Sequence, residues 1–296
     1  MAKQAKQLSG KVAVVTGATG AVGSSLARKL VQRGVKVAMA DLSQEKLDEV
    51  AASIGTPDVL PMALDVSDRV AYTRYLDEVE RRLGPVDFLC NVAAIMPISA
   101  FDEERDEMSQ RILDVNLGAI IFSTKDAARR MKQRGSGHIV NVASGASWLA
   151  GGGVATYCAS KFGLLGYSEA VKMELRGSGV EISVVVPAVI KSDMSKGLKD
   201  VRGVRAVDPS EVADGIIRVL ERPKFAEFVP PAIGVMSLGF SAVPYKLRHM
   251  LTRLSRTDLL LLQADQSKRV EYESRVASQL ESPSGETDPA GEKAHV

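Results

Sequence analysis

Residues 11–31 read KVAVVTGATGAVGSSLARKLV, and this stretch decides the fold. Its first five residues, KVAVV, form a short run that is apolar after Lys11, which is typical of a strand buried on both faces. A glycine turn and then a helical pattern follow. Glycines at such a turn let the backbone approach a pyrophosphate, which the positive end of the helix attracts. The stretch therefore predicts a dinucleotide site whose turn carries Gly17, Thr19, Gly20, Val22 and Gly23.

The same alternation of apolar runs and helical patterns continues along the chain. Helical patterns separate the runs that we expect to form strands, at residues 11–15, 35–40, 59–64, 86–90, 138–142, 181–186 and 226–229. Continuous rather than alternating apolar runs predict a parallel sheet with helices on both faces. We therefore expect an α/β fold with a doubly wound parallel sheet of Rossmann type.

We expect the 296 residues to be organised in four parts. A tail over residues 1–10 precedes one Rossmann-type catalytic domain over residues 11–229. A helical C-terminal extension covers residues 230–280. Residues 281–296 are rich in Pro, Gly, Ser and Glu, a composition that predicts disorder.

The composition is that of an ordinary soluble protein. Charged residues make up 25% of the chain and the net charge is +2, so nothing favours a nucleic acid partner. Cys90 and Cys158 lie in apolar contexts, and we interpret them as reduced thiols of a cytoplasmic protein. The three histidines form no cluster, so we expect no metal site.

The C-terminal extension begins with an uncharged stretch, Phe228 to Tyr245. The stretch is nearly long enough to span a bilayer, but its prolines disfavour a transmembrane helix. We prefer a substrate cap or an oligomer contact. Peripheral membrane contact through residues 228–256 is the alternative, because basic residues follow.

Polar or turn residues stand where the expected strands end. Parallel α/β sheets bind ligands at the carboxyl ends of their strands, so we expect a site at Asp41, Asp65, Asn91, Ser144 and Pro187. Asp41 is expected to accept the ribose hydroxyls of NAD and to repel the extra phosphate of NADP, although a helix cap is its alternative role. Asp65 is interpreted as a contact of the adenine amino group or as a solvated turn residue.

Residues 141–161 read NVASGASWLAGGGVATYCASK. Tyr157 and Lys161 are one helical turn apart and share a face of a helix that begins near Ala155. An ammonium group beside a phenol lowers the phenol's pKa from ~10 toward working pH. The Ser144 hydroxyl is expected to hydrogen-bond the oxygen whose proton Tyr157 moves. The alternative for a Tyr-x-x-x-Lys pattern is a pair of unrelated exposed residues.

Together these motifs resemble the short-chain dehydrogenase/reductase family in its single-domain form, from about Lys11 to Phe228. The resemblance implies a catalytic tetrad of Asn116, Ser144, Tyr157 and Lys161. It implies further cofactor contacts at Val66, Asn91, Ala93, Pro187, Val189 and Ser192. A nicotinamide cofactor, chemistry at a carbon–oxygen bond and a homodimer or homotetramer are also implied. In that family role Asn116 interrupts its helix and positions water.

The glycine turn departs from the family pattern, because Ala21 stands where a glycine is expected. Its spacing resembles the extended branch of the family, so an NAD-dependent epimerase or dehydratase is an alternative function. A non-catalytic nicotinamide-binding sensor is another. The intact tetrad and the chain length favour an oxidoreductase over both.

Apolar side chains are expected to wall the substrate pocket, namely Met96, Ile98, Trp148, Leu149, Met194 and Leu198. They predict a hydrophobic secondary alcohol, or its ketone, as the substrate. In the oxidising direction, Tyr157 takes the alcohol proton while a hydride leaves the carbon. The alternative is that these apolar side chains only pack.

Overall fold

The computed structural model describes residues 5–198, 205–235, 239, 243–244, 246–247, 250 and 261–281. The tail expected to be disordered lies outside the described residues, apart from its first residue. Much of the stretch considered for membrane contact also lies outside them. Both interpretations therefore stay predictions.

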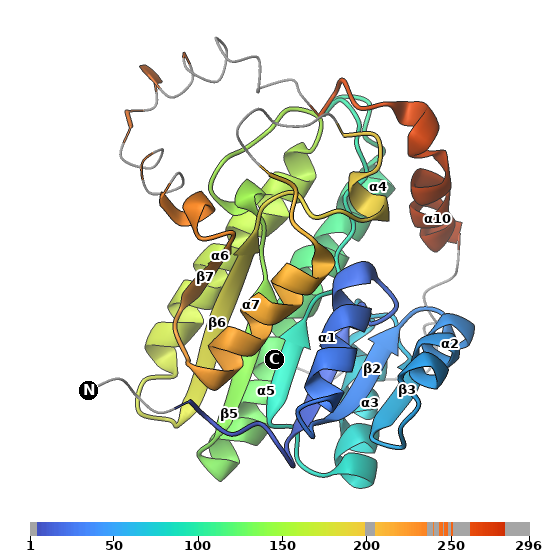
Figure 1. The fold of residues 1–296 in the computed structure, drawn as a ribbon. Helices are drawn as coiled ribbons and strands as arrows, with labels where there is room; N and C mark the ends of the chain where they lie inside the picture. The colour runs from blue at the N-terminus through green and yellow to red at the C-terminus, as the bar shows by residue number, and fades with distance from the viewer. Residues whose placement is uncertain are drawn as a thin grey trace, which may run out of the picture.

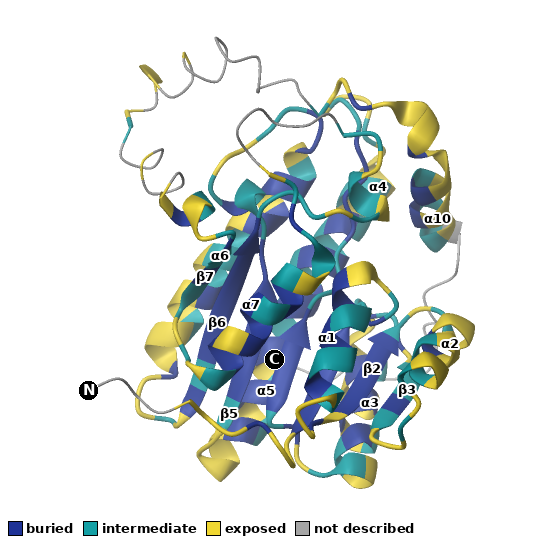
Figure 2. Cartoon of the chain, in the orientation of Figure 1, coloured by how far each residue is buried: buried dark blue, intermediate teal, exposed yellow. Residues whose placement is uncertain are grey.

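The centre of the fold is a sheet of seven parallel strands in the order β3-β2-β1-β4-β5-β6-β7 (Figure 1). The strands are β1 (Val12–Thr16), β2 (Lys36–Asp41), β3 (Val59–Ala63), β4 (Phe88–Asn91), β5 (Gly137–Val142), β6 (Val180–Pro187) and β7 (Ala226–Val229). Figure 2 shows these strands as largely buried. The predicted α/β fold with a doubly wound parallel sheet is confirmed.

Helices cover both faces of the sheet. They are α1 (Ala21–Val31), α2 (Gln44–Ile54), α3 (Arg69–Leu83), α4 (Asp106–Leu113), α5 (Ala119–Arg134), α6 (Ala155–Glu174), α7 (Pro209–Glu221) and α10 (Val270–Glu281). Alternate residues of β1 face the two layers: Val12 and Val14 pack in the cluster that contains α3, whereas Ala13 and Val15 pack with α1 and α7. Burial on both faces explains why the strand is apolar throughout.

The helix expected over about residues 104–134 is divided in the structure. A π-helical turn, Asp114–Gly118, separates α4 from α5. A π-helical turn adds a residue to the normal helical repeat and often marks a functional position. The apolar pattern alone predicted one continuous helix, whereas the family resemblance implied an interruption at Asn116, and the structure has one there. Asn116 lies inside it.

Residues 261–281 return to the carboxyl ends of the strands. Figure 1 shows α10 beside α4, and the two helices are in contact. Tyr272 and Val276 of α10 are buried in the same apolar cluster as Met96 and Tyr157. In the part of the chain that the structure describes, no helix is long and apolar enough to cross a membrane.

Candidate active site

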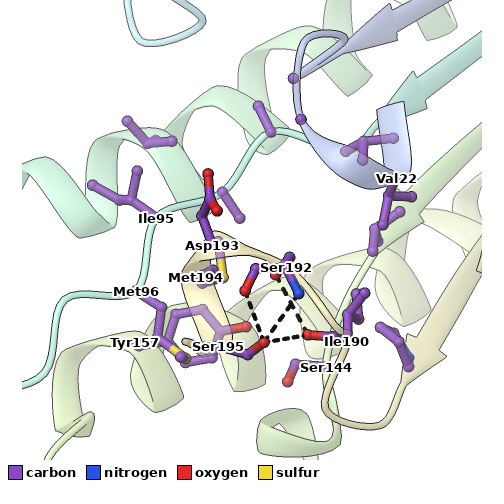
Figure 3. Close-up of a pocket in the computed structure, with 18 of the residues that line it drawn as sticks. Val22, Ile95, Met96, Ser144, Tyr157, Ile190, Ser192, Asp193, Met194 and Ser195 are labelled. Atoms are coloured by element: carbon purple, nitrogen blue, oxygen red, sulfur yellow. Dashed lines mark hydrogen bonds between the residues drawn. The ribbon is translucent and has the colours of Figure 1, made fainter. Parts of the chain in front are cut away.

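A large cavity, with a volume of about 1760 Å³, opens at the carboxyl ends of the strands. The glycine turn and Asp41 line one part of it, and Tyr157 lines another. Figure 3 shows Val22 on one side, with Met96 and Tyr157 on the other. The predicted site residues that line it are Gly17, Thr19, Gly20, Val22, Asp41, Asp65, Val66, Ala93, Met96, Ser144, Trp148, Leu149, Tyr157, Lys161, Pro187, Val189, Ser192 and Met194.

The glycine turn is shaped for close approach of the backbone. Gly17 has a φ of 66°, and a Cβ there would lie 2.9 Å from the backbone of Ala93. A Cβ on Gly23 would lie only 2.2 Å from the carbonyl oxygen of Gly17. No side chain caps the amino end of α1, so this end is suited to a phosphate. The turn fits the pyrophosphate of a dinucleotide.

Asp41 ends β2 and is fixed at the cavity wall. Its Oδ2 accepts hydrogen bonds from the backbone amide and the hydroxyl of Thr19, at 2.9 and 2.6 Å. Its Oδ1 accepts from the amide of Leu42 at 2.8 Å. The cap of α2 is Ser43, whose hydroxyl accepts from the amide of Lys46 at 3.3 Å. Asp41 therefore presents a negative charge to the cavity and is not a helix cap.

Asp65 has partners that the sequence did not indicate. The guanidinium of Arg111 lies 3.0 Å from its Oδ2, and Ser67 donates to its Oδ1 through the backbone amide and the hydroxyl. Burial alone would raise the pKa of Asp65, but Ser67 and Arg111 outweigh burial and hold the pKa below its ordinary value. Asp65 is therefore an ionised residue in a polar cluster at the cavity wall.

Tyr157 and Lys161 lie on the first turns of α6, and both are buried. The Nζ of Lys161 donates to the carbonyl of Val142 at 3.0 Å, and it lies 5.7 Å from the centroid of the Tyr157 ring. The Ser144 hydroxyl interacts with the Tyr157 phenol and also accepts from the amide of Ala146 at 3.1 Å. Three polar side chains thus meet at one end of the cavity.

The pKa values of Tyr157 and Lys161 differ from the sequence-based expectation. Burial raises the pKa of Tyr157 to about 12, although the Ser144 hydroxyl opposes the rise. Burial also lowers the pKa of Lys161 to about 8. The expected depression of the phenol's pKa by Lys161 is not seen, because desolvation dominates both groups. Ser144 is the neighbour that favours the phenolate in this structure.

Asn116 is completely buried and does not line the cavity. Its side-chain amide donates to the carbonyl of Ile95 at 2.9 Å, and its carbonyl accepts from the amide of Ile95 at 2.9 Å. This pair of bonds ties the π-helical turn to the loop after β4. Asn116 thereby fixes the backbone next to Met96.

The expectation that Asn91 contacts the cofactor is not supported by its position. Its amide nitrogen donates to Oδ1 of Asn141 at 2.9 Å, and the amide of Asn141 donates to the hydroxyl of Ser168 at 3.0 Å. The side chain therefore points into the core and joins β4 and β5 to α6. Pairing of a buried amide there satisfies its hydrogen bonds. The cavity wall is instead formed by Val92 and Ala93.

The apolar wall includes the expected Met96, Trp148, Leu149 and Met194. The Trp148 ring packs against Phe228, with ring centroids 6.1 Å apart. Ile98 is buried in the core and does not line the cavity, whereas Leu198 does.

The C-terminal segment supplies cavity residues that the sequence-based interpretation did not identify. They are Leu261, Tyr272, Arg275, Val276, Ser278 and Gln279. Nearby, Arg269 is completely buried and donates to the carbonyls of Met96, Met194 and Lys196. The spacing of Tyr272 and Val276 on one face of a charged helix was the available signal.

The cavity thus combines a dinucleotide cradle with a phenol, a hydroxyl and an ammonium group. A phenol that exchanges a proton with a substrate oxygen, beside a group that accepts or donates a hydride, is suited to alcohol–ketone interconversion.

Comparison with known proteins identifies a family of oxidoreductases. Residues 11–202 match the family model described as short chain dehydrogenase. The chain is 33% identical over 216 residues to meso-2,3-butanediol dehydrogenase of Serratia marcescens, covering 69% of this chain and 84% of the relative. It is 30% identical over 191 residues to the 3-oxoacyl-[acyl-carrier-protein] reductase FabG of Escherichia coli (strain K12), covering 64% and 78%. It is 31% identical over 219 residues to 11-beta-hydroxysteroid dehydrogenase-like 6 of Arabidopsis thaliana, covering 73% and 64%.

Proposed function

The chain belongs to the short-chain dehydrogenase family of oxidoreductases, and we propose that it interconverts a hydrophobic secondary alcohol and its ketone. The observation that carries this proposal is the meeting of Ser144, Tyr157 and Lys161 in the cavity that also contains the glycine turn. A tyrosine that interacts with a serine hydroxyl inside a dinucleotide cavity is suited to proton exchange with a substrate oxygen.

The family uses nicotinamide nucleotides, and we propose NAD as the preferred one. Gly17, Gly23 and the uncapped amino end of α1 would hold the pyrophosphate. The fixed carboxylate of Asp41 would accept the ribose hydroxyls. When bound, the nicotinamide supplies the acceptor or donor of the hydride.

The proposed roles of the polar residues follow from their contacts. In the reducing direction the protonated Tyr157 phenol donates its proton to the substrate oxygen as the carbon accepts a hydride, and in the oxidising direction its phenolate, which the Ser144 hydroxyl favours, takes the alcohol proton. The Ser144 hydroxyl hydrogen-bonds the same substrate oxygen. Lys161 is held by the carbonyl of Val142 and contributes a positive charge beside the phenol when it is protonated. Asn116 positions the loop after β4 through Ile95.

The apolar lining supports a hydrophobic substrate. Met96, Trp148, Leu149 and Met194 line the same cavity as Tyr157. The names of two relatives include butanediol and a hydroxysteroid, which are both secondary alcohols; of the two, the hydroxysteroid is the hydrophobic one. We also propose that the chain forms a homodimer or homotetramer, as the family resemblance implies.

The test is turnover by the purified protein with NAD and a panel of secondary alcohols, followed as NADH formation. Tyr157→Phe should reduce kcat at least 100-fold, because the proton acceptor is lost. The Kd of NAD should stay within about twofold, since the ring is retained. Retained turnover, or preference for small hydrophilic polyols, would contradict the proposal.

The extended-branch alternative is favoured only by the glycine spacing around Ala21. An epimerase or dehydratase regenerates its bound nucleotide in each cycle. Stoichiometric release of free NADH would therefore support the oxidoreductase and exclude that alternative.

A further inference from the structure

Tyr272 of α10 brings a second phenol to the cavity. Its side chain is buried and lines the cavity. Its hydroxyl oxygen accepts a hydrogen bond from the backbone amide of Met96 at 2.8 Å. Met96 also lines the cavity, at the end that contains Tyr157 (Figure 3). Tyr272 and Tyr157 are close enough to interact electrostatically.

The proton of the Tyr272 hydroxyl is available to a ligand. A phenol can donate one hydrogen bond and accept others. The contact with Met96 uses the acceptor capacity, and no residue within the described ranges accepts the Tyr272 proton. Burial also raises the pKa of Tyr272 well above its ordinary value, so the hydroxyl keeps its proton at working pH. A polar ligand atom in the cavity can therefore accept this hydrogen bond.

The Tyr272 ring is held in one place. The guanidinium carbons of Arg269 and Arg275 lie 5.2 and 5.5 Å from its centroid. Arg269 is anchored by Glu273 and by three backbone carbonyls, and Arg275 lies 3.6 Å from the carboxylate of Asp193. A hydroxyl held in this way is already oriented before a ligand binds, which reduces the entropic cost of its hydrogen bond.

We propose that Tyr272 is a specificity-determining residue that donates a hydrogen bond to a second oxygen of the substrate. The preferred substrates are then hydrophobic alcohols or ketones that carry another hydroxyl or carbonyl near the reacting carbon. This inference rests on the proposed function. Tyr157 and Ser144 hold the reacting oxygen of the substrate. Tyr272, on α10, binds the second oxygen.

The test compares two ketones that differ in one oxygen. The probes are 1-phenylpropane-1,2-dione and 1-phenylpropan-2-one, each reduced with NADH by the full-length protein. Tyr272→Phe keeps the ring between the two arginines and removes only the hydroxyl. We expect kcat/KM for the dione to fall about fivefold to tenfold, the size of one hydrogen bond. We expect kcat/KM for the monoketone to change less than about twofold.

Tyr167→Phe is the matched control, because its hydroxyl donates to the carbonyl of Ile121 at 3.1 Å and does not line the cavity. It should leave the preference between the two ketones unchanged. An equal loss for both ketones in Tyr272→Phe would identify a structural role and overturn the inference, as would an unchanged preference. If wild-type protein turns over alcohols of the panel but reduces neither ketone, the inference fails alone; if it binds NADH and turns over neither the panel nor the ketones, the proposed function fails and the inference fails with it.

Discussion

Thr19 and Asp41 are joined by two hydrogen bonds that end on a single carboxylate oxygen, at 2.9 and 2.6 Å. The contact ties the glycine turn to the end of β2. The other oxygen of Asp41 accepts from the amide of Leu42, so the carboxylate is held on both sides. Its negative charge is fixed at the cavity wall, where it can discriminate between nucleotides.

Asp41→Ala should weaken NAD binding and improve NADP binding. Loss of hydrogen bonds between the ribose and a charged acceptor should raise the Kd of NAD about tenfold or more. The Kd of NADP should fall, because repulsion disappears and Lys46, which also lines the cavity, can meet the phosphate. Titration calorimetry with both nucleotides measures the change.

The matched control is Asp58→Asn, which removes an exposed carboxylate that does not line the cavity. Both dissociation constants should then stay within about twofold of wild type. An Asp41→Ala protein that still prefers NAD by the original ratio would contradict the role of this carboxylate.

Two alanine substitutions in the glycine turn should differ in how much stability they cost. A Cβ on Gly23 would lie 2.2 Å from the carbonyl oxygen of Gly17, whereas a Cβ on Gly20 would lie 3.2 Å from the same atom. Gly20 has a φ of −69°, which alanine adopts readily. Gly23→Ala should therefore lower the free energy of unfolding by about 2–3 kcal/mol, and Gly20→Ala by less than about 1 kcal/mol. Urea unfolding of the two variants distinguishes them, and similar losses would refute the steric explanation.

The buried Lys161 should make stability depend on pH. Burial lowers its pKa from 10.5 to about 8. Between these values the unfolded chain holds the proton and the folded chain does not, so stability rises as pH increases through this window. Relative to Lys161→Met, wild type should gain ~2 kcal/mol of unfolding free energy between about pH 7.5 and 9.5. Urea unfolding at the two pH values measures the difference in unfolding free energy between wild type and Lys161→Met. The same difference at both pH values would mean that folding does not shift the pKa of Lys161.

The sheet and the cavity residues near its strand ends were predictable, because both depend on local patterns. Apolar runs define strands such as β1, and parallel strands bring residues such as Asp41 and Ser144 to one edge. Two features depend on long-range packing, which no local pattern encodes: the direction of the Asn91 side chain and the position of α10. The direction of the Asn91 side chain is set by Asn141 of the neighbouring strand.

The position of α10 is the second such feature. A helical extension that caps the substrate site was one expectation for residues 230–280, but the residues of α10 that line the cavity were not identified. Arg269 looks like an ordinary surface residue in the sequence, whereas the structure buries it completely. Its bonds to Met96 and Met194 join segments that are far apart in the chain. Only tertiary contacts reveal its role.

Arg269→Met should release the C-terminal segment from the cavity. The substitution removes the guanidinium, which donates to the carbonyls of Met96, Met194 and Lys196 at 3.0, 2.7 and 3.2 Å, respectively. It also leaves Glu273 without its partner at 2.8 Å. Because the side chain of Glu273 is 28% exposed, the pair is only partly buried, and its loss together with the carbonyl contacts should cost about 2–3 kcal/mol. Because these contacts hold residues 261–281, we expect that segment to become the first site of limited proteolysis.

Lys268→Met is the control, because its side chain is 69% exposed and lies 3.5 Å from Asp265. An exposed pair of this kind contributes less than about 1 kcal/mol, so proteolysis should be unchanged.

The double variant Arg269→Met with Glu273→Gln should recover part of the lost stability, since no unpaired charge remains. The Kd of NAD should change little in Arg269→Met, whereas kcat/KM should fall, because Arg269 holds the loops of Met96 and Met194 and not the glycine turn. Equal proteolysis of wild type and Arg269→Met would show that other contacts hold α10 in place.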